Sequence, residues 1–180
     1  MKIISGKFKG RNIIIPNNQA RPTLDRAKET LFNILQFDLE GVRVLDLFAG
    51  SGSLGFEALS RGAIQTVFVD QDSISIEAVK QNAQRFVCLD EISVIKSDYQ
   101  TALAMLDGKF DIVFIDPPYM CDYYVNALQL LCKYNLLSPQ AIIVCESSLK
   151  TILPTSVDIL HQYRIKKVGT INFTFYKLGV

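Results

Sequence analysis

A short apolar strand pattern that runs into a glycine-rich loop is the feature that most constrains the fold of this chain of 180 residues. Residues 42–48 are mainly apolar, and Gly50, Gly52 and Gly55 follow in the spacing G-x-G-x-x-G just before a helical pattern. Asp70 ends the next apolar segment, 20 residues beyond Gly50. This order is typical of a nucleotide-cofactor site, in which the glycines allow a tight turn and the acid accepts hydrogen bonds from ribose hydroxyls.

Strand and helix patterns alternate along the rest of the chain. The sequence predicts strands at residues 42–48, 66–69, 93–96, 110–115 and 141–146, and helices at 54–61, 73–85, 99–106 and 125–134. This alternation favours an α/β fold with a mostly parallel sheet, helices on both faces, and ligands beyond the carboxyl ends of the strands. An antiparallel hairpin of residues 159–166 and 170–177 is expected at the sheet edge, which makes seven strands.

The N-terminal residues form a basic extension of this predicted fold. Residues 3–4 and 12–15 flank a glycine-containing turn and predict a small β-hairpin, and a helix follows over residues 23–35 with Thr23 as its N-cap. The first 30 residues hold seven Lys or Arg against two acids. This charge suits an arm that meets phosphate, and a solvated hairpin accounts for it equally well.

We expect one domain over residues 1–180, because nothing in the sequence resembles a linker or a repeat. Within it, the basic hairpin takes residues 1–20 and the Rossmann-like catalytic core takes residues 21–180.

Two further acids bear on the identity of the cofactor. Asp46 lies in a mainly apolar strand pattern, where a nicotinamide site usually has an apolar residue. We expect it to accept hydrogen bonds from loop amides or from the ammonium group of an amino-acid-bearing cofactor. Asp98 follows the third strand, where it can accept from an adenine amino group or cap the next helix. An amino-acid-bearing cofactor is favoured, and a nicotinamide-dependent oxidoreductase is the alternative.

The most specific motif is Asp116-Pro117-Pro118-Tyr119, which directly follows the apolar residues 110–115. Prolines have no amide donor, so this loop offers acceptors, namely the Asp116 side chain and the Pro117 carbonyl. These acceptors can hold the exocyclic amine of a nucleic-acid base, and Asp116 or water can take the proton that the amine loses. Tyr119 can stack on the base. We interpret all four residues as catalytic; the alternative is a kinked turn in which Tyr119 packs.

The stretch from Asp46 to Gly62 (DLFAGSGSLGFEALSRG), together with residues 116–119, resembles the RsmD family of 16S ribosomal RNA guanine-N2 methyltransferases. Residues 3–11 and 21–33 are similar to the N-terminal signature of that family, so the resemblance covers nearly the whole chain. It implies a Rossmann-like class I methyltransferase fold. It also implies transfer of a methyl group from S-adenosylmethionine to N2 of one guanine, within an assembled or partly assembled small ribosomal subunit.

The resemblance also implies roles for individual residues. The cofactor would be held by Arg21, Thr23, Asp46, Phe48, Ala49, Gly50, Ser51, Gly52, Asp70, Gln71 and Asp98. The RNA would be contacted by Lys2, Lys7, Lys9, Arg11 and Arg26. The chain departs from the family in having Asp70 where Glu is common, and in lacking a basic C-terminal tail.

Three other functions compete with guanine-N2 methylation. Adenine-N6 methyltransferases of RNA or DNA share the Asp-Pro-Pro-Tyr motif, but the DNA enzymes usually add a target-recognition segment that is not visible here. Methylases of the glutamine amide in release factors typically carry Asn in place of Asp116 and need a further substrate domain. A catalytically idle RNA-binding module would not need the motif at positions 116–119.

Other kinds of site are not expected. The four cysteines are isolated, and so is His161, which argues against a metal site, a disulfide or a nucleophilic triad. The apolar runs are too short to cross a bilayer, and the N-terminus lacks the apolar segment of a secretory signal. We therefore expect a cytoplasmic protein that binds no metal and no membrane, and we expect it to be a monomer.

Overall fold

The computed structural model of the protein describes residues 1–16, 22–118 and 122–179; for residues 22–24 and 122 it describes the backbone alone. In these ranges the α-helices are α1 (Pro22–Ile34), α2 (Ser53–Ser60), α3 (Ser73–Phe86), α4 (Tyr99–Met105) and α5 (Asp122–Lys133). A short 3-10 helix, η2 (Leu89–Glu91), follows α3. The strands are β1 (Arg43–Asp46), β2 (Gln65–Asp70), β3 (Ile92–Lys96), β4 (Phe110–Ile115), β5 (Leu137–Ser148), β6 (Ser156–Val157), β7 (Leu160–Val168) and β8 (Ile171–Leu178).

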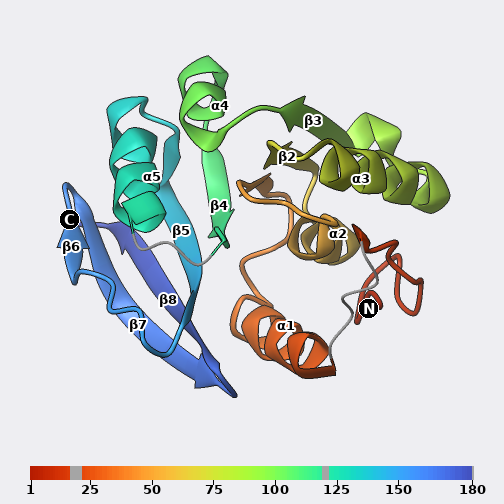
Figure 1. Cartoon of the computed structure of the whole chain (residues 1–180), viewed down its shortest axis with the longest axis horizontal. Coiled ribbons are helices and arrows are strands. Elements are labelled where there is room, and N and C mark those ends of the chain that lie inside the picture. Colours follow the sequence, from red (N-terminus) through yellow and green to blue (C-terminus); the bar gives the residue numbers. More distant parts are fainter. Residues whose placement is uncertain (17–21, 119–121, 180) are drawn as a thin grey trace.

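All the strands belong to one sheet in the order β3-β2-β1-β4-β5-β8-β7-β6. The pairs from β3 to β5 are parallel, and those from β5 to β6 are antiparallel. Figure 1 shows β7 and β8 along the edge of the molecule that carries the C-terminus. The predicted α/β fold with an antiparallel C-terminal edge is therefore confirmed.

The sequence-based strand count of seven was wrong by one, because the described sheet has eight strands. The additional strand, β6, has only two residues, which pair with His161 and Leu160 across a turn at Asp158. A strand this short has no alternation of apolar and polar residues by which a sequence could reveal it.

Helices cover both faces of the sheet and enclose two apolar clusters. One cluster lies under α1, α2 and α3 and includes Phe32, Phe56 and Phe114. The other lies under α4 and α5 and includes Leu103 and Leu128. Figure 1 shows α4 and α5 together on one side of the sheet. This arrangement leaves the carboxyl ends of the parallel strands open as a place for a ligand.

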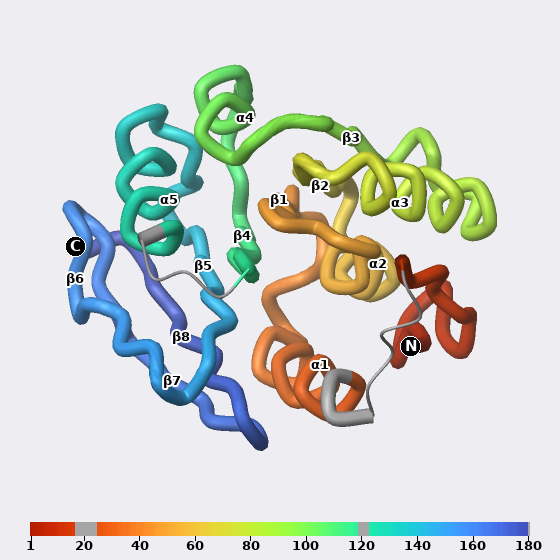
Figure 2. Tube along the Cα trace, in the orientation of Figure 1, coloured from red at the N-terminus to blue at the C-terminus, as the bar shows by residue number. Residues whose placement is uncertain are grey.

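The N-terminal segment packs on the helices instead of forming the predicted β-hairpin. Its only described ladder contact is an isolated bridge between Lys2 and Asn12. The backbone N–H groups of Ile4 and Ser5 donate to the Glu57 carboxylate of α2 instead of to an opposing strand. Figure 2 shows this segment beside α2 and α3. Acceptors on α2 therefore replace the strand partner that a hairpin would need.

Helix α1 begins one residue earlier than predicted. It starts at Pro22, so Thr23 lies within the helix and is not its N-cap. Proline is favoured at the first helical position because its missing amide proton would have no partner there. Among the described residues, none of the helices is both long and apolar enough to cross a membrane.

Candidate functional site

A cavity of about 710 Å³ opens at the carboxyl ends of the parallel strands. Residues at the ends of the five parallel strands, or just after them, line it. They are Phe48 and Gly50 after β1, Asp70 and Gln71 at the end of β2, Asp98 after β3, Asp116 to Pro118 after β4, and Glu146 to Ser148 at the end of β5. This volume is within the usual range for a small-molecule site. The cavity therefore brings the predicted cofactor loop and the predicted catalytic motif together.

The glycines of the loop serve different purposes. Gly50 has φ +53°, and a Cβ atom at this position would meet nothing within 4 Å. Gly52 has φ +77°, and its Cβ would lie 2.7 Å from the ring of Phe56. Gly50 therefore leaves the backbone open to a ligand, whereas Gly52 is required by the turn and by packing.

Asp70 links the loop after β2 to the glycine loop. One carboxylate oxygen accepts a hydrogen bond from the Gly50 amide (2.8 Å), and the other accepts from the Asp72 amide (2.9 Å). Each oxygen has a second lone pair, and Asp70 lines the cavity, so it can still accept from a ligand hydroxyl.

Asp46 is buried beneath the glycine loop, with 2% of its surface exposed. Its Oδ2 atom accepts a hydrogen bond from the Gly55 amide at 3.0 Å, as predicted for a loop amide. Burial, and to a smaller extent the neighbouring Asp116 and Asp70, raise the pKa of Asp46 to about 8 against the opposing effect of the Gly55 hydrogen bond. Among the described residues, no other donor reaches this carboxylate, so it is suited to a cationic ligand group.

Asp98 caps helix α4 and lines the cavity as well. Its carboxylate accepts a hydrogen bond from the Thr101 amide at 2.9 Å, and this bond lowers the pKa of Asp98. The capping alternative is thus confirmed, and the position in the cavity leaves the second oxygen available to a ligand.

Asp116 stands at the end of β4 with its side chain exposed to the cavity. The protein around the cavity still desolvates the carboxylate enough to raise the pKa of Asp116 above its ordinary value of 3.8. Pro117 is buried and Pro118 is exposed next to it. A carboxylate with a raised pKa beside donor-free backbone can accept a proton near neutral pH.

Two kinds of residue at the cavity were missed by the sequence-based prediction. From the sequence, Tyr123 and Tyr124 could line the base pocket, but aromatics before a helix more often pack or cap it, so the predicted site does not include them. Both line the cavity, and the centroid of the Tyr123 ring lies 6.1 Å from that of Phe48 and 5.5 Å from that of Tyr99. Glu146 lines it too. The available signal was an acid directly after the apolar residues 141–145, the same arrangement that draws attention to Asp116.

The predicted RNA-binding residues differ in their surroundings. Lys2, Lys9 and Arg26 are exposed. Lys7 forms an ion pair with Glu91, and Arg11 donates to the backbone carbonyl of Arg85 at 3.2 Å. The first three are therefore more readily available to phosphate.

Another basic residue of this region, Lys28, has a structural role. Lys28 is buried and lies 3.4 Å from Oε2 of Glu57, which is also paired with Arg61. Burial lowers the pKa of Lys28. The net positive charge counted in the sequence thus overstates what the N-terminal region presents to a partner.

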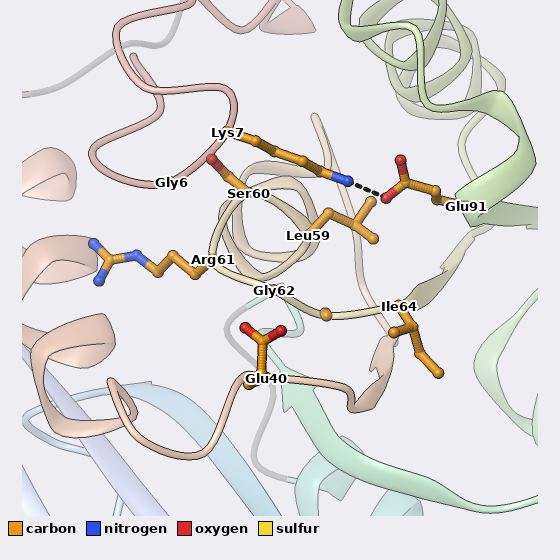
Figure 3. Close-up of a pocket in the computed structure, with 10 residues that line it drawn as sticks. Gly6, Lys7, Glu40, Leu59, Ser60, Arg61, Gly62, Ile64 and Glu91 are labelled. Atoms are coloured by element: carbon orange, nitrogen blue, oxygen red, sulfur yellow. Dashed lines mark hydrogen bonds and ion pairs between the residues drawn. The ribbon is translucent and has the colours of Figure 1, made fainter.

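A second hollow, of about 560 Å³, lies at the amino ends of the strands, against α2 and the N-terminal segment. Figure 3 shows the Lys7–Glu91 ion pair on one side of it and Glu40 on the other. Apart from Lys7, none of the predicted site residues that the structure describes lines this hollow. The predicted chemistry therefore belongs to the cavity at the carboxyl ends.

The predicted site extends to residues beyond those that the structure describes. Arg21 and Tyr119 lie outside the described residues, as does the side chain of Thr23. Of the remaining predicted residues, Ala49, Ser51 and Gly52 belong to the loop below the cavity without lining it. Among the described residues there is no group of three or more His, Cys, Asp or Glu that could hold a metal ion.

The chain is similar to known proteins over nearly its whole length. Residues 1–177 match the family described as "Conserved hypothetical protein 95". Ribosomal RNA small subunit methyltransferase D of Haemophilus influenzae is 37% identical over 98% of this chain and 93% of that protein. The protein of the same name from Escherichia coli is 34% identical over 98% of this chain and 89% of that protein. A solved structure from Escherichia coli, described as a candidate methyltransferase, has a TM-score of 0.89 at 30% identity, covering 100% of this chain and 98% of that one.

Proposed function

The chain belongs to the RsmD family, described as conserved hypothetical protein 95, and we propose that it methylates the exocyclic N2 amine of a guanine in small-subunit ribosomal RNA. The resemblance that residues 46–62 and 116–119 carry is thereby confirmed. The relatives are named as methyltransferases of small-subunit ribosomal RNA, which supports this substrate and S-adenosylmethionine as the donor. The choice of guanine N2 over adenine N6 rests on the resemblance.

The observation that carries the proposal is the shared cavity of the glycine loop and the Asp116-Pro117-Pro118 segment. A nucleotide-cofactor loop alone fits many reactions, and an acceptor-rich loop alone fits a turn. Because the two loops line the same cavity, they fit the transfer of a methyl group from a bound donor to an amine. A nicotinamide enzyme would not require the acid at position 116 beside donor-free prolines.

The residues around the loop fit S-adenosylmethionine. The open side of Gly50 gives room for close approach, and Asp46 is a buried acid with one described donor, which suits the ammonium group of the methionine part. Asp70 would accept from the ribose hydroxyls, and Asp98 from the adenine amino group. When bound, S-adenosylmethionine supplies a sulfonium methyl group that an amine nitrogen can attack.

The catalytic residues act on the amine of the base. The nitrogen of an exocyclic amine is a weak nucleophile because its lone pair is delocalised into the ring. The Asp116 carboxylate and the Pro117 carbonyl accept hydrogen bonds from the two N–H groups of the amine. These two bonds orient the nitrogen. The nitrogen would take the methyl group as its bond to the sulfonium sulfur breaks, which leaves a neutral thioether, and it would lose one proton to Asp116 or to water. The role of Tyr119 as the stacking face remains a prediction from the sequence.

The RNA partner would meet the protein through Lys2, Lys9 and Arg26, which are exposed around the N-terminal segment. A chain with little surface for reading sequence would depend on RNA shape and on neighbouring ribosomal protein. We therefore propose that the substrate is a small subunit or an assembly intermediate, and that the protein acts as a cytoplasmic monomer. Equal activity on naked RNA and on particles would contradict the dependence on a particle.

The test is transfer of a labelled methyl group from S-adenosylmethionine to small subunits that lack this modification. The wild type should produce N2-methylguanine, and Asp116→Ala should lower the rate by at least about 100-fold, because it removes the acceptor of the amine and its proton. The donor affinity of Asp116→Ala should remain within a few-fold of wild type. The exposed acid Asp90 provides the control variant Asp90→Ala, which should leave the rate unchanged. N6-methyladenine as the product would overturn the assignment.

A further inference from the structure

A second carboxylate stands beside the catalytic one. Ile115 of β4 is in register with Cys145 of the parallel strand β5. Asp116 and Glu146 are the next residues along these two strands, and both line the cavity. Figure 1 shows β4 and β5 side by side. Residues in register on neighbouring parallel strands point to the same face, at a backbone spacing of about 4.8 Å, so the two acids approach the same part of the cavity.

The backbone of Glu146 is held from two directions. On one side, the Tyr124 hydroxyl donates to the Glu146 carbonyl oxygen at 2.6 Å. On the other side, Glu146 pairs with Phe173 of β8, which is buried. Because the strand end is held firmly, Glu146 has a defined position relative to the cavity. A residue that selects one base over another needs such a fixed position.

The two acids have no described cation to neutralise them. The ion pairs among the described residues all involve Lys7, Lys28 or Arg61, none of which lines this cavity. Burial and the neighbouring Asp116 raise the pKa of Glu146 above its ordinary value of 4.5. Two adjacent carboxylates without a cation are stabilised by a ligand that offers several N–H groups side by side.

We propose that Glu146 accepts a hydrogen bond from N1–H of the target guanine while Asp116 holds its N2 amine, so that Glu146 selects guanine over adenine. This inference rests on the proposed function and adds how the same site chooses its base. Guanine presents N1–H and the N2 amine as adjacent donors. Adenine presents an amine beside N1, and its N1 is an acceptor. The Glu146 carboxylate is also an acceptor, so no hydrogen bond would form between them.

The test replaces the target guanine, once mapped in the wild-type reaction, with 2-aminopurine in reconstituted subunits. This base keeps the reacting amine, but its N1 is an acceptor. The wild type should methylate guanine about 10- to 100-fold faster than 2-aminopurine, the discrimination typical of a matched base contact. Glu146→Gln should narrow this ratio, because the glutamine amide can donate to N1 of 2-aminopurine. Glu146→Ala should narrow it as well, through loss of activity on guanine.

Controls separate a base contact from a structural effect. Glu146→Gln should not lower the melting temperature, and it should keep the wild-type affinity for S-adenosylmethionine, measured by calorimetry. The exposed acid Glu77 provides the matched control Glu77→Gln, which should keep the wild-type ratio of guanine to 2-aminopurine. An unchanged ratio in both Glu146 variants, with N2-methylguanine made by the wild type, would overturn this inference alone. Absence of N2-methylguanine from the wild-type reaction would overturn the proposed function and this inference with it.

Discussion

Replacing Asp46 with asparagine should stabilise the free protein while weakening its hold on the methyl donor. Burial raises the pKa of Asp46 from 3.8 to about 8. In the unfolded chain the acid releases its proton near pH 3.8, whereas in the folded protein it holds the proton until about pH 8. Rising pH between these values therefore favours the unfolded state of the wild type, and the uncharged asparagine side chain would remove this dependence.

The magnitude follows from the size of the shift. Because pH 7 lies about three pH units above the ordinary pKa of 3.8 and below the raised pKa of about 8, the wild type loses ~4 kcal/mol of stability by pH 7, at ~1.4 kcal/mol per unit. The new amide can still accept from Gly55 through its oxygen, but its N–H donors lack a described partner, which costs ~1–3 kcal/mol. The net gain is ~1–3 kcal/mol at pH 7, which corresponds to a rise in melting temperature of ~2–10 °C.

The assay is thermal unfolding at pH 5, 6, 7 and 8, with and without S-adenosylmethionine. The difference in stability between Asp46→Asn and the wild type should grow with pH by up to ~1.4 kcal/mol per unit. The donor should raise the melting temperature of the wild type and have a much smaller effect on the variant, because a charge-assisted hydrogen bond has been lost. Asp90→Asn, at an exposed position, should show neither change. A variant no more stable than the wild type at pH 8, or a difference independent of pH, would refute the reasoning.

Three further changes test the packing of the site and its approach to RNA. Glu57→Gln should destabilise the protein by ~3–5 kcal/mol, because it leaves Lys28 buried without its charge partner. Hydrogen exchange at the N-terminal residues should accelerate with it. Gly52→Ala should cost ~2–4 kcal/mol in urea unfolding, since its φ is +77° and its Cβ would press on the Phe56 ring. Lys9→Ala should weaken binding to the subunit and reduce the slope of log affinity against log salt by about one.

Matched variants show whether each effect has the stated cause. Glu77→Gln alters an exposed acid of a helix and should change stability by less than ~0.5 kcal/mol. Gly10→Ala isolates backbone strain, because φ is +82° and nothing lies within 4 Å of its Cβ; a cost equal to that of Gly52→Ala would rule out the clash with Phe56. Lys80→Ala removes an exposed lysine from α3, and an equal loss of RNA affinity would mean that Lys9 has no special place in binding.

Much of the fold could be predicted because its signals are local. The strand at residues 110–115 was predicted with its observed bounds, and the helix predicted at 73–85 was only one residue short. Apolar periodicity and the residues that end each element lie within a few positions of one another, so a single sequence displays them. The meeting of Gly50 and Asp116 in one cavity followed from a general rule for parallel sheets.

The misses depend on contacts between distant parts of the chain. The N-terminal segment was predicted to pair with itself, but Ile4 and Ser5 donate to Glu57, more than 50 residues away. In the sequence, Lys28 is counted as one of the charges of the basic N-terminal region. The structure shows that it is buried and paired with Glu57 of α2. Hydrogen-bond partners at such separations have no periodic signature.

Neighbouring residues specify the order of elements, the glycine loop and the acceptor-rich motif after β4, so these three features could be predicted from the sequence. The tertiary structure was needed to show that Glu146 shares the cavity with the predicted acids. Asp70, Asp116 and Glu146 line the cavity although they are spread over more than 70 residues of sequence, and Asp46 lies beneath the adjoining glycine loop; strand order and register bring all four to one edge of the sheet. Burial raises the pKa values of Asp46, Asp116 and Glu146, and the nearby Asp116 raises those of Asp46 and Glu146 further, because desolvation and repulsion depend on distance in space and not on separation along the chain.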